Sequence, residues 1–220
     1  MTAMGVDIAQ GGADFTLIAR RHDWWFDKMI AVPGKQTPEG SDVAALVVKY
    51  RRDGATVILD MGGGYGGAPA VHLKDTSITT VPYKGQLKSS ARDKSGQMGF
   101  VNRRSEAYWK FREALDPDQS GGARVALPDD QMMVSDLTAP TYEVIRQNGR
   151  LCVKVEAKEE VKKRLGRSTD RGDAVVMAWF DGAKNVQTSG KVNALEHGTD
   201  PRQYRHAPKV NLGHENKRRR

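Results

Sequence analysis

The chain has a single cysteine and no long hydrophobic run. Cys152 alone excludes an internal disulfide and a cysteine-rich zinc site. No stretch approaches the roughly 20 apolar residues of a membrane-spanning helix, and Asp7 interrupts the first apolar run, which argues against a signal peptide. The histidines lack the spacing of metal ligands. These absences favour an intracellular protein without a membrane partner.

The charge of the chain is strongly one-sided. Its 220 residues carry a formal net charge of +8, and 38% of them are hydrophobic, which is enough for one core. A basic protein favours a polyanionic partner, with nucleic acid as the first candidate and an anionic membrane surface as the second. The basic end of the chain, Lys217–Arg220, could account for part of the same excess.

Hydrophobic periodicity predicts an α/β fold. Three strands are expected in the first 34 residues, followed by strands and helices in alternation. The expected strands are 4–10, 14–21, 24–34, 55–60 and 78–85, and the expected helices between them are 37–52 and 68–74. We therefore predict a mixed sheet of five to seven strands, in which an antiparallel meander is followed by parallel strands, with helices on both faces.

The second half is expected to be mainly helical, with one β-hairpin. The dipeptide Asn148-Gly149 between two alternating runs predicts a hairpin over 141–156. Polar residues 86–99 are expected to be a mobile loop. The expected helices are 102–115, 128–140, 158–166 and 169–180. A domain over 1–180 followed by a flexible basic tail over 181–220 is the predicted organisation.

Aspartates stand at positions where an acid needs a partner. Asp7 lies inside the first strand, Asp60 ends the fourth, and Asp170 and Asp173 precede an apolar helix. Parallel strands end at one edge of a sheet, so the three regions could meet there. Clustered carboxylates repel one another, and Mg²⁺ or Mn²⁺ removes that conflict. Two such ions can clamp a phosphodiester during hydrolysis. Each acid taken alone could instead be a turn former or a helix cap.

The segments "GVDIAQGGADFTLIA", "VILDMGGGYGGAPAVHL", "FVNRRSEAYWKFREAL" and "KKRLGRSTDRGDAVVMAW" occur in an order that resembles the C-terminal nuclease domain of viral (tailed bacteriophage) terminase large subunits. The resemblance implies an RNase H-like fold and a two-metal endonuclease that cuts concatemeric viral double-stranded DNA during packaging, in the host cell cytoplasm. It matches the family's three acids to Asp7, Asp60 and Asp173, with Asp170 as a further candidate metal ligand.

The same resemblance implies other partners, namely the terminase ATPase domain, the small terminase subunit and the portal. The glycine-rich segment "GGGYGGAPA" lacks the lysine of a phosphate-binding P-loop, so no ATPase motif is present. Asp14 follows the Gly-Gly turn and is either an outer acid of the site or, as we favour, a structural residue. Basic residues around the polar loop and the long helix are candidate DNA contacts: Lys84, Lys88, Arg92, Lys94, Arg103 and Arg104.

Two alternatives remain open from the sequence. One is another RNase H-like nuclease, of the Holliday-junction resolvase or transposase type, which would differ in its DNA substrate. The other is a non-catalytic basic DNA-binding or assembly module, whose acids would only cap turns and helices and whose thermal stability would not respond to divalent ions.

Overall fold

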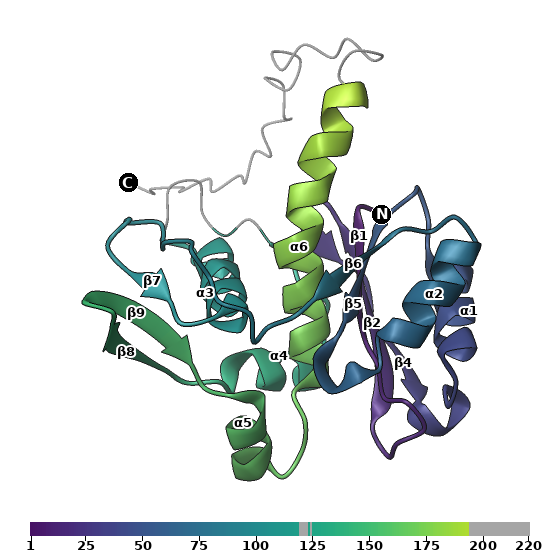
Figure 1. Cartoon of the computed structure of the whole chain (residues 1–220), viewed down its shortest axis with the longest axis horizontal. Coiled ribbons are helices and arrows are strands. Elements are labelled where there is room, and N and C mark those ends of the chain that lie inside the picture. Colours follow the sequence, from purple (N-terminus) through teal and green to yellow (C-terminus); the bar gives the residue numbers. More distant parts are fainter. Residues whose placement is uncertain (119–122, 124, 194–220) are drawn as a thin grey trace, which may run out of the picture. The chain divides into compact units, whose positions relative to one another are not determined.

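The computed structural model describes residues 1–118, 123 and 125–193 (Figure 1). Residues Met1–Val186 form one compact unit, and Gln187–Arg220 form a second. Most of the predicted basic tail therefore lies outside the described residues. Within the described part of the chain, no helix combines the length and the apolar character that crossing a membrane requires.

The main sheet has six strands and mixes antiparallel with parallel pairs. The strand order is β3-β2-β1-β5-β6, and β4 also pairs with β2. The strands are β1 (Ala3–Asp7), β2 (Phe15–His22), β3 (Trp25–Phe26), β4 (Ile30–Pro33), β5 (Thr56–Asp60) and β6 (Thr80–Tyr83). β1 runs antiparallel to β2 and parallel to β5, which in turn runs parallel to β6. The predicted meander followed by parallel strands is confirmed.

The third predicted strand is wrong in detail, because 24–34 is not one strand. It is divided into β3 and β4, and both pair with β2. The break falls at Asp27, whose side chain accepts a hydrogen bond from the backbone N–H of Lys28 at 2.7 Å. Such a side-chain-to-backbone bond favours a turn over an extended strand, in keeping with the bend between the two short strands.

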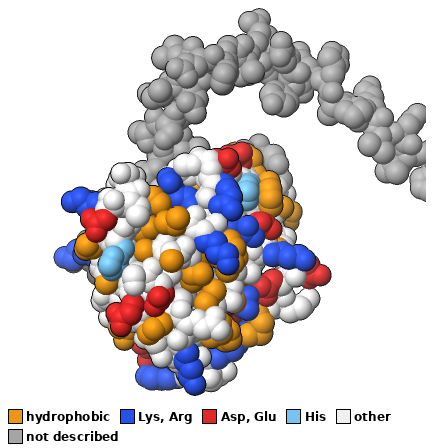
Figure 2. All heavy atoms as spheres, turned by 90° about the vertical axis from the view of Figure 1, so that its right-hand side faces the viewer, with side chains coloured by type: hydrophobic (Ala, Val, Ile, Leu, Met, Phe, Trp, Pro, Cys, Tyr) orange, Lys and Arg blue, Asp and Glu red, His pale blue; other side chains and the backbone are white. Residues whose placement is uncertain are grey.

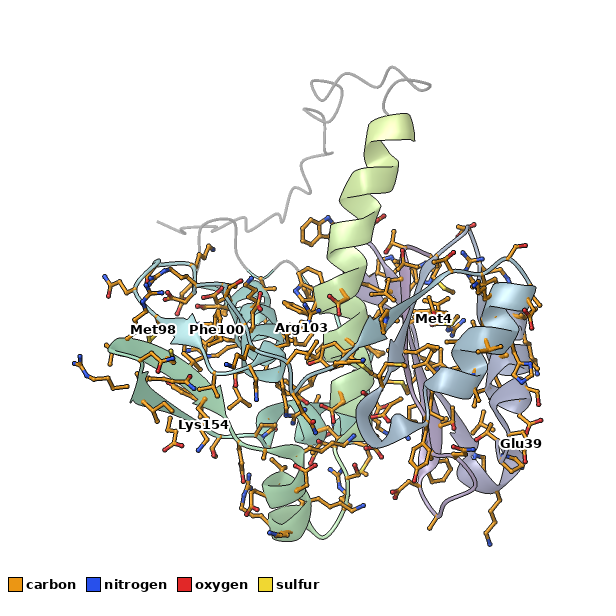
Figure 3. The ribbon with its side chains drawn as sticks, in the orientation of Figure 1. Met4, Glu39, Met98, Phe100, Arg103 and Lys154 are labelled. Atoms are coloured by element: carbon orange, nitrogen blue, oxygen red, sulfur yellow. The ribbon has the colours of Figure 1, made fainter. Side chains whose placement is uncertain are left out.

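Helices cover both faces of this sheet (Figure 1). α1 (Gly40–Tyr50) and α2 (Gly67–Asp75) lie on one face, and α6 (Asp170–Asn193) lies on the other. Successive side chains of β1 point to opposite faces of the sheet and so contribute to the cores on both sides. Met4 packs with the α1 and α2 core, as Figure 3 shows, while Ala3 packs in the core that contains α6. Short 3₁₀ turns follow β4 (Gly34–Gln36) and β5 (Gly62–Gly64).

α6 approaches β1 more closely than ordinary side chains allow. A Cβ atom added at Gly5 would lie 2.2 Å from the carbonyl oxygen of Ala174, and one added at Gly182 would lie 2.4 Å from the Cβ of Ala3. The small residues of this helix therefore allow contact at backbone distance. The prediction that the helix ends at residue 180 is wrong, because Asp181 is buried and the helix continues to Asn193.

A second, three-stranded sheet lies in the other half of the unit. Its order is β7 (Gly99–Phe100), β9 (Arg150–Val155) and β8 (Tyr142–Gln147). The predicted hairpin is confirmed, since Asn148 and Gly149 both adopt the positive φ of a tight primed turn. The helices here are α3 (Arg103–Leu115), α4 (Gln131–Thr138) and α5 (Lys158–Leu165).

The polar segment 86–99 contains a loop folded around Asp93. Its carboxylate accepts the backbone N–H of Met98 at 2.8 Å and the hydroxyl of Ser95 at 2.5 Å. A bridge between Arg92 and Gly99 closes the loop next to β7. The composition of glycine, serine and lysine predicted a mobile loop; the segment has no long helix or strand, and it has internal hydrogen bonds that the composition alone did not indicate.

Candidate metal centre

Two of the predicted acids end neighbouring parallel strands. In the β1–β5 pair Val6 lies opposite Leu59, so Asp7 and Asp60 are the next residues of the two strands. Alternation places both on the face that α6 covers, because Gly5 and Ile58 precede them by two positions and face that helix. The first and fourth predicted strands are therefore neighbours, which brings these two acids to one edge.

α6 supplies the remaining acids from its first turn. Asp170 and Asp173 are three residues apart, so they lie on one side of the helix. The side chains of Asp7, Asp170 and Asp173 each offer an oxygen, and these oxygens all lie within 4.8 Å of one another. The trio is a potential cation site, because three carboxylates at this range repel unless a positive charge lies between them.

Asp60 lies on the wall of the same site rather than in the tight trio. All four acids line one cavity of about 510 Å³. One Asp60 oxygen accepts the backbone N–H of Gly62 at 2.8 Å, which orients the carboxylate at the start of the glycine-rich turn. Gly66 lets the chain turn back here, since a Cβ atom at this position would lie 2.5 Å from the Asp60 carbonyl oxygen.

Lys158, which the sequence did not single out, lies among the three clustered carboxylates. Its ammonium is 2.8 Å from Asp170 and 3.1 Å from each of Asp7 and Asp173. The lysine is the first residue of α5, directly after the hairpin. In the sequence it belongs to a run of charged residues that is typical of a solvated helix, so no local signal could have identified it. Chemically, the ammonium occupies the place that a metal cation would take.

Asp173 has one oxygen committed to protein partners and one facing Lys158. Its Oδ1 accepts hydrogen bonds from Arg104 and, at 2.7 Å, from the hydroxyl of Tyr108. Its Oδ2 contacts Lys158 and, at 3.3 Å, the hydroxyl of Thr169. The Arg104 guanidinium also lies 4.4 Å from the centre of the Tyr108 ring. Arg104 and Tyr108 therefore fix the orientation of this carboxylate, as outer groups do for many metal ligands.

The surroundings shift the pKa values of Asp7, Asp60 and Asp173 in different directions. Burial raises the pKa of Asp7 to about 7, although the Lys158 ammonium opposes the rise. Burial also raises the pKa of Asp60, against the hydrogen bond from Gly62. For Asp173 burial acts in the same direction, but Arg104 and Lys158 outweigh it and lower its pKa. A metal ion that binds Asp7 must therefore compete with a proton near neutral pH, whereas Asp173 is held in its ionised form.

The donor set fits a hard divalent cation. The clustered ligand atoms are all carboxylate oxygens, and no histidine or cysteine lines the cavity. Such oxygen-only sets suit Mg²⁺ and Mn²⁺ rather than Zn²⁺. Asp14 lies at the rim, more than half exposed and 3.6 Å from Lys162, so it supports the cavity edge at most.

The predicted DNA contacts divide into two groups. Arg103 pairs with Asp181 at 2.6 Å, beside α6 as Figure 3 shows, and Arg104 pairs with Asp173. Both arginines are thus engaged within the protein fold. The lysines and the arginine of the polar segment are all exposed: Lys84, Lys88, Arg92 and Lys94.

Comparison with known proteins identifies the fold. No protein-family model matches the chain, and no curated protein matches its sequence. Among solved structures, the nuclease domain of the large terminase subunit gp2 of bacterial virus Sf6 matches with a TM-score of 0.58 and 19% identity, over 80% of this chain and 86% of that one. A lysine-to-alanine variant of the gp2 domain with manganese matches with a TM-score of 0.55 and 18% identity, over 76% and 84%. The same domain with manganese and β-thujaplicinol gives 0.55 and 18%, over 81% and 89%. The chain has the RNase H-like fold of large terminase nuclease domains.

Proposed function

We propose that the chain is a divalent-metal-dependent endonuclease domain that cuts double-stranded DNA. The observation that carries the proposal is the carboxylate trio of Asp7, Asp170 and Asp173, with Asp60 on the wall of the same cavity. These acids are brought together at the ends of parallel strands, where α/β sheets bind their ligands. The terminase-like fold adds support, because relatives with this fold have been solved with manganese and are named nucleases.

Asp7, Asp60 and Asp173 would hold two Mg²⁺ or Mn²⁺ ions, with Asp170 as a further ligand. When bound, such a pair activates water and stabilises the departing oxygen of a phosphodiester. The protein's own part is orientation. Arg104 and Tyr108 hold Oδ1 of Asp173, which leaves Oδ2 for the cavity. Lys158 must give up its contacts with the trio when a cation enters.

Within this proposal, the substrate is concatemeric viral DNA in the host cell cytoplasm, cut during genome packaging. The chain contains no Walker A loop, so movement of the DNA would depend on the terminase ATPase domain. The small terminase subunit and the portal would be the other partners. These assignments follow the terminase resemblance and extend the nuclease assignment to a biological setting.

A plasmid-nicking assay tests the proposal. Supercoiled DNA is incubated with the protein in Mg²⁺, in Mn²⁺ and in EDTA. We expect nicking and linearisation in either metal and none in EDTA. Asp60→Asn should abolish cutting and remain folded, because its side-chain oxygen can still accept the Gly62 N–H. Asp75→Asn, an exposed acid at the end of α2, is the matched control and should cut as the unaltered protein does.

Two results would overturn the proposal. Undiminished metal-dependent cutting by Asp60→Asn, Asp7→Asn and Asp173→Asn would exclude this site. Absence of cutting, together with no rise in the unfolding temperature in Ca²⁺ or Mn²⁺, would favour a non-catalytic DNA-binding module. A four-way junction included as a second substrate separates the resolvase-type alternative, which predicts preference for the junction over linear duplex.

A further inference from the structure

A second hollow adjoins the cavity that holds the acids. It has a volume of about 360 Å³, and Val101 lines both hollows. Its walls come from residues 88–92, from β7 and from the hairpin end of β8 and β9. The segment that leads from one hollow to the other is continuous in sequence, because Gly85 and Gln86 line the first and Lys88 lines the second.

The charge of the second hollow is of one sign. Lys88, Arg92 and Arg150 line it, and its lining includes no aspartate or glutamate. All three side chains are exposed, and within the described residues neither Lys88 nor Arg150 is seen to form an ion pair. Arg92 donates one hydrogen bond to the carbonyl of Gly96 at 3.0 Å and retains further N–H groups. We call these three residues the basic groove.

The geometry of β9 connects the basic groove to the acids. Alternation puts Arg150, Cys152 and Lys154 on the same side of the strand, and Lys154 lines the cavity of the acids. Arg150 and Lys154 are four residue steps apart along the strand, a span of about 13 Å. This span corresponds to about four base-pair steps of 3.4 Å along the axis of a DNA duplex. The acid on this side is Glu143, which pairs with Lys154 at 2.7 Å.

Figure 2 shows the face that carries α1 and α2, where lysines and arginines are interspersed with acids and apolar side chains. Arg103 and Arg104 do not add to the positive charge available to DNA, because both are paired with buried aspartates. The second hollow is thus lined by charges of one sign and adjoins the cavity of the carboxylates.

We infer that the basic groove binds the phosphate backbone of duplex DNA on one side of the bond to be cut, so that the adjoining phosphate reaches the acids. This inference rests on the proposed nuclease function. Exposed cations bind a polyanion with release of its counterions, without reading base sequence. Lys84 and Lys94, which do not line the hollow, contribute less.

The test is DNA binding in EDTA, where the metal site plays no part. A fluorescently labelled duplex is titrated with protein at several salt concentrations. The variant Lys88→Gln/Arg92→Gln/Arg150→Gln is compared with the control Lys35→Gln/Lys49→Gln/Lys74→Gln, which removes the same charge from exposed positions on the other side. Circular dichroism and thermal unfolding verify that both variants are folded.

We expect the groove variant to bind on the order of a hundredfold more weakly at about 0.1 M salt and the slope of log K against log salt to fall by about 2.7, at about 0.9 for each phosphate contact. The control should lose far less. Equal losses of DNA affinity in both variants, or no loss in the groove variant, would overturn the inference. In that case metal-dependent cutting in the nicking assay would still support the nuclease proposal. Conversely, selective loss of binding without any cutting supports the groove and refutes the nuclease.

Discussion

Replacing Lys158 with alanine should increase the affinity of the site for divalent ions. In the metal-free protein this ammonium contacts Asp7, Asp170 and Asp173 at 2.8–3.1 Å, so it competes with any cation for the same oxygens. The lysine side chain is 28% exposed, and it can therefore move into water when it leaves the trio. The substitution removes a competitor without removing a ligand.

The size of the effect follows from the contacts that a metal ion must break. A hydrogen bond between charged groups contributes about 1.5–3 kcal/mol net. Hydration of the released ammonium compensates for most of the other two contacts, so the cost of displacing Lys158 is close to that of one such bond. Since about 1.4 kcal/mol corresponds to a factor of ten, we expect Ca²⁺ to bind Lys158→Ala about 10- to 100-fold more tightly.

Isothermal titration with Ca²⁺ well above pH 7 measures this directly. Loss of the Lys158 ammonium removes a charge that lowers the pKa of Asp7, so a high pH is needed to limit competition by a proton. Lys162→Ala is the matched control: it removes the same charge one turn later on α5, where Lys162 is half exposed and 3.6 Å from Asp14. Unchanged affinity in Lys158→Ala, or an equal gain in Lys162→Ala, would refute the view that the ammonium occupies the cation site.

Three further predictions test the packing and the electrostatics around the site. Gly5→Ala should destabilise the protein by about 3 kcal/mol, because its methyl group has no room against α6. Urea unfolding measures this change in the free energy of unfolding. Gly67→Ala is the control and should lose little stability, because no atom lies near its Cβ position. Asp136→Ala should lower the free energy of unfolding by about 3 kcal/mol in the same assay. Asp136 is buried, pairs with Arg167 and accepts hydrogen bonds from backbone N–H groups in the first turn of α6. A decrease below about 0.5 kcal/mol would contradict this. The pKa of Asp7 is raised to about 7, so its carboxyl group is mostly protonated below that pH. Because a proton and Ca²⁺ then compete for the same oxygens, Ca²⁺ affinity should fall by up to about tenfold from pH 7 to pH 6. Equal affinity at pH 8 and pH 6 would exclude this competition.

The acids at the strand ends were predictable because the rule behind them is local. A buried run that ends in Asp60 indicates a parallel strand, and parallel neighbours end at one edge of the sheet. Asp7 and Asp173 needed only the further assumption that the first strand and the last helix pack together. The structure places these acids, with Asp170, around one cavity, whereas their roles as metal ligands stay predictions.

The partners of those acids were not predictable, because they depend on tertiary contacts. Arg104 looked like a phosphate contact at the start of a helix, yet α3 stands so that its guanidinium meets Asp173. Lys158 is separated from Asp7 by 151 positions. The sequence prediction ended this helix too early for a related reason. Asp181 forms an ion pair with Arg103, and Gly182 packs closely against Ala3. Neither residue is apolar, so neither extends the hydrophobic pattern of the helix.

The short contact between β1 and α6 explains how small residues position acids. The carbonyl of Ala174 lies where a Cβ of Gly5 would be, Asp173 directly precedes Ala174, and Asp7 lies two residues after Gly5. The separation of the two carboxylates is thus determined by a backbone-to-backbone contact that a single methyl group would widen. A larger residue at position 5 would move α6 outward and take Asp170 and Asp173 with it, away from Asp7. The small apolar residues of this helix therefore determine where the acids at its start lie. Close packing in the core thus sets the distances between the carboxylates that could hold a cation.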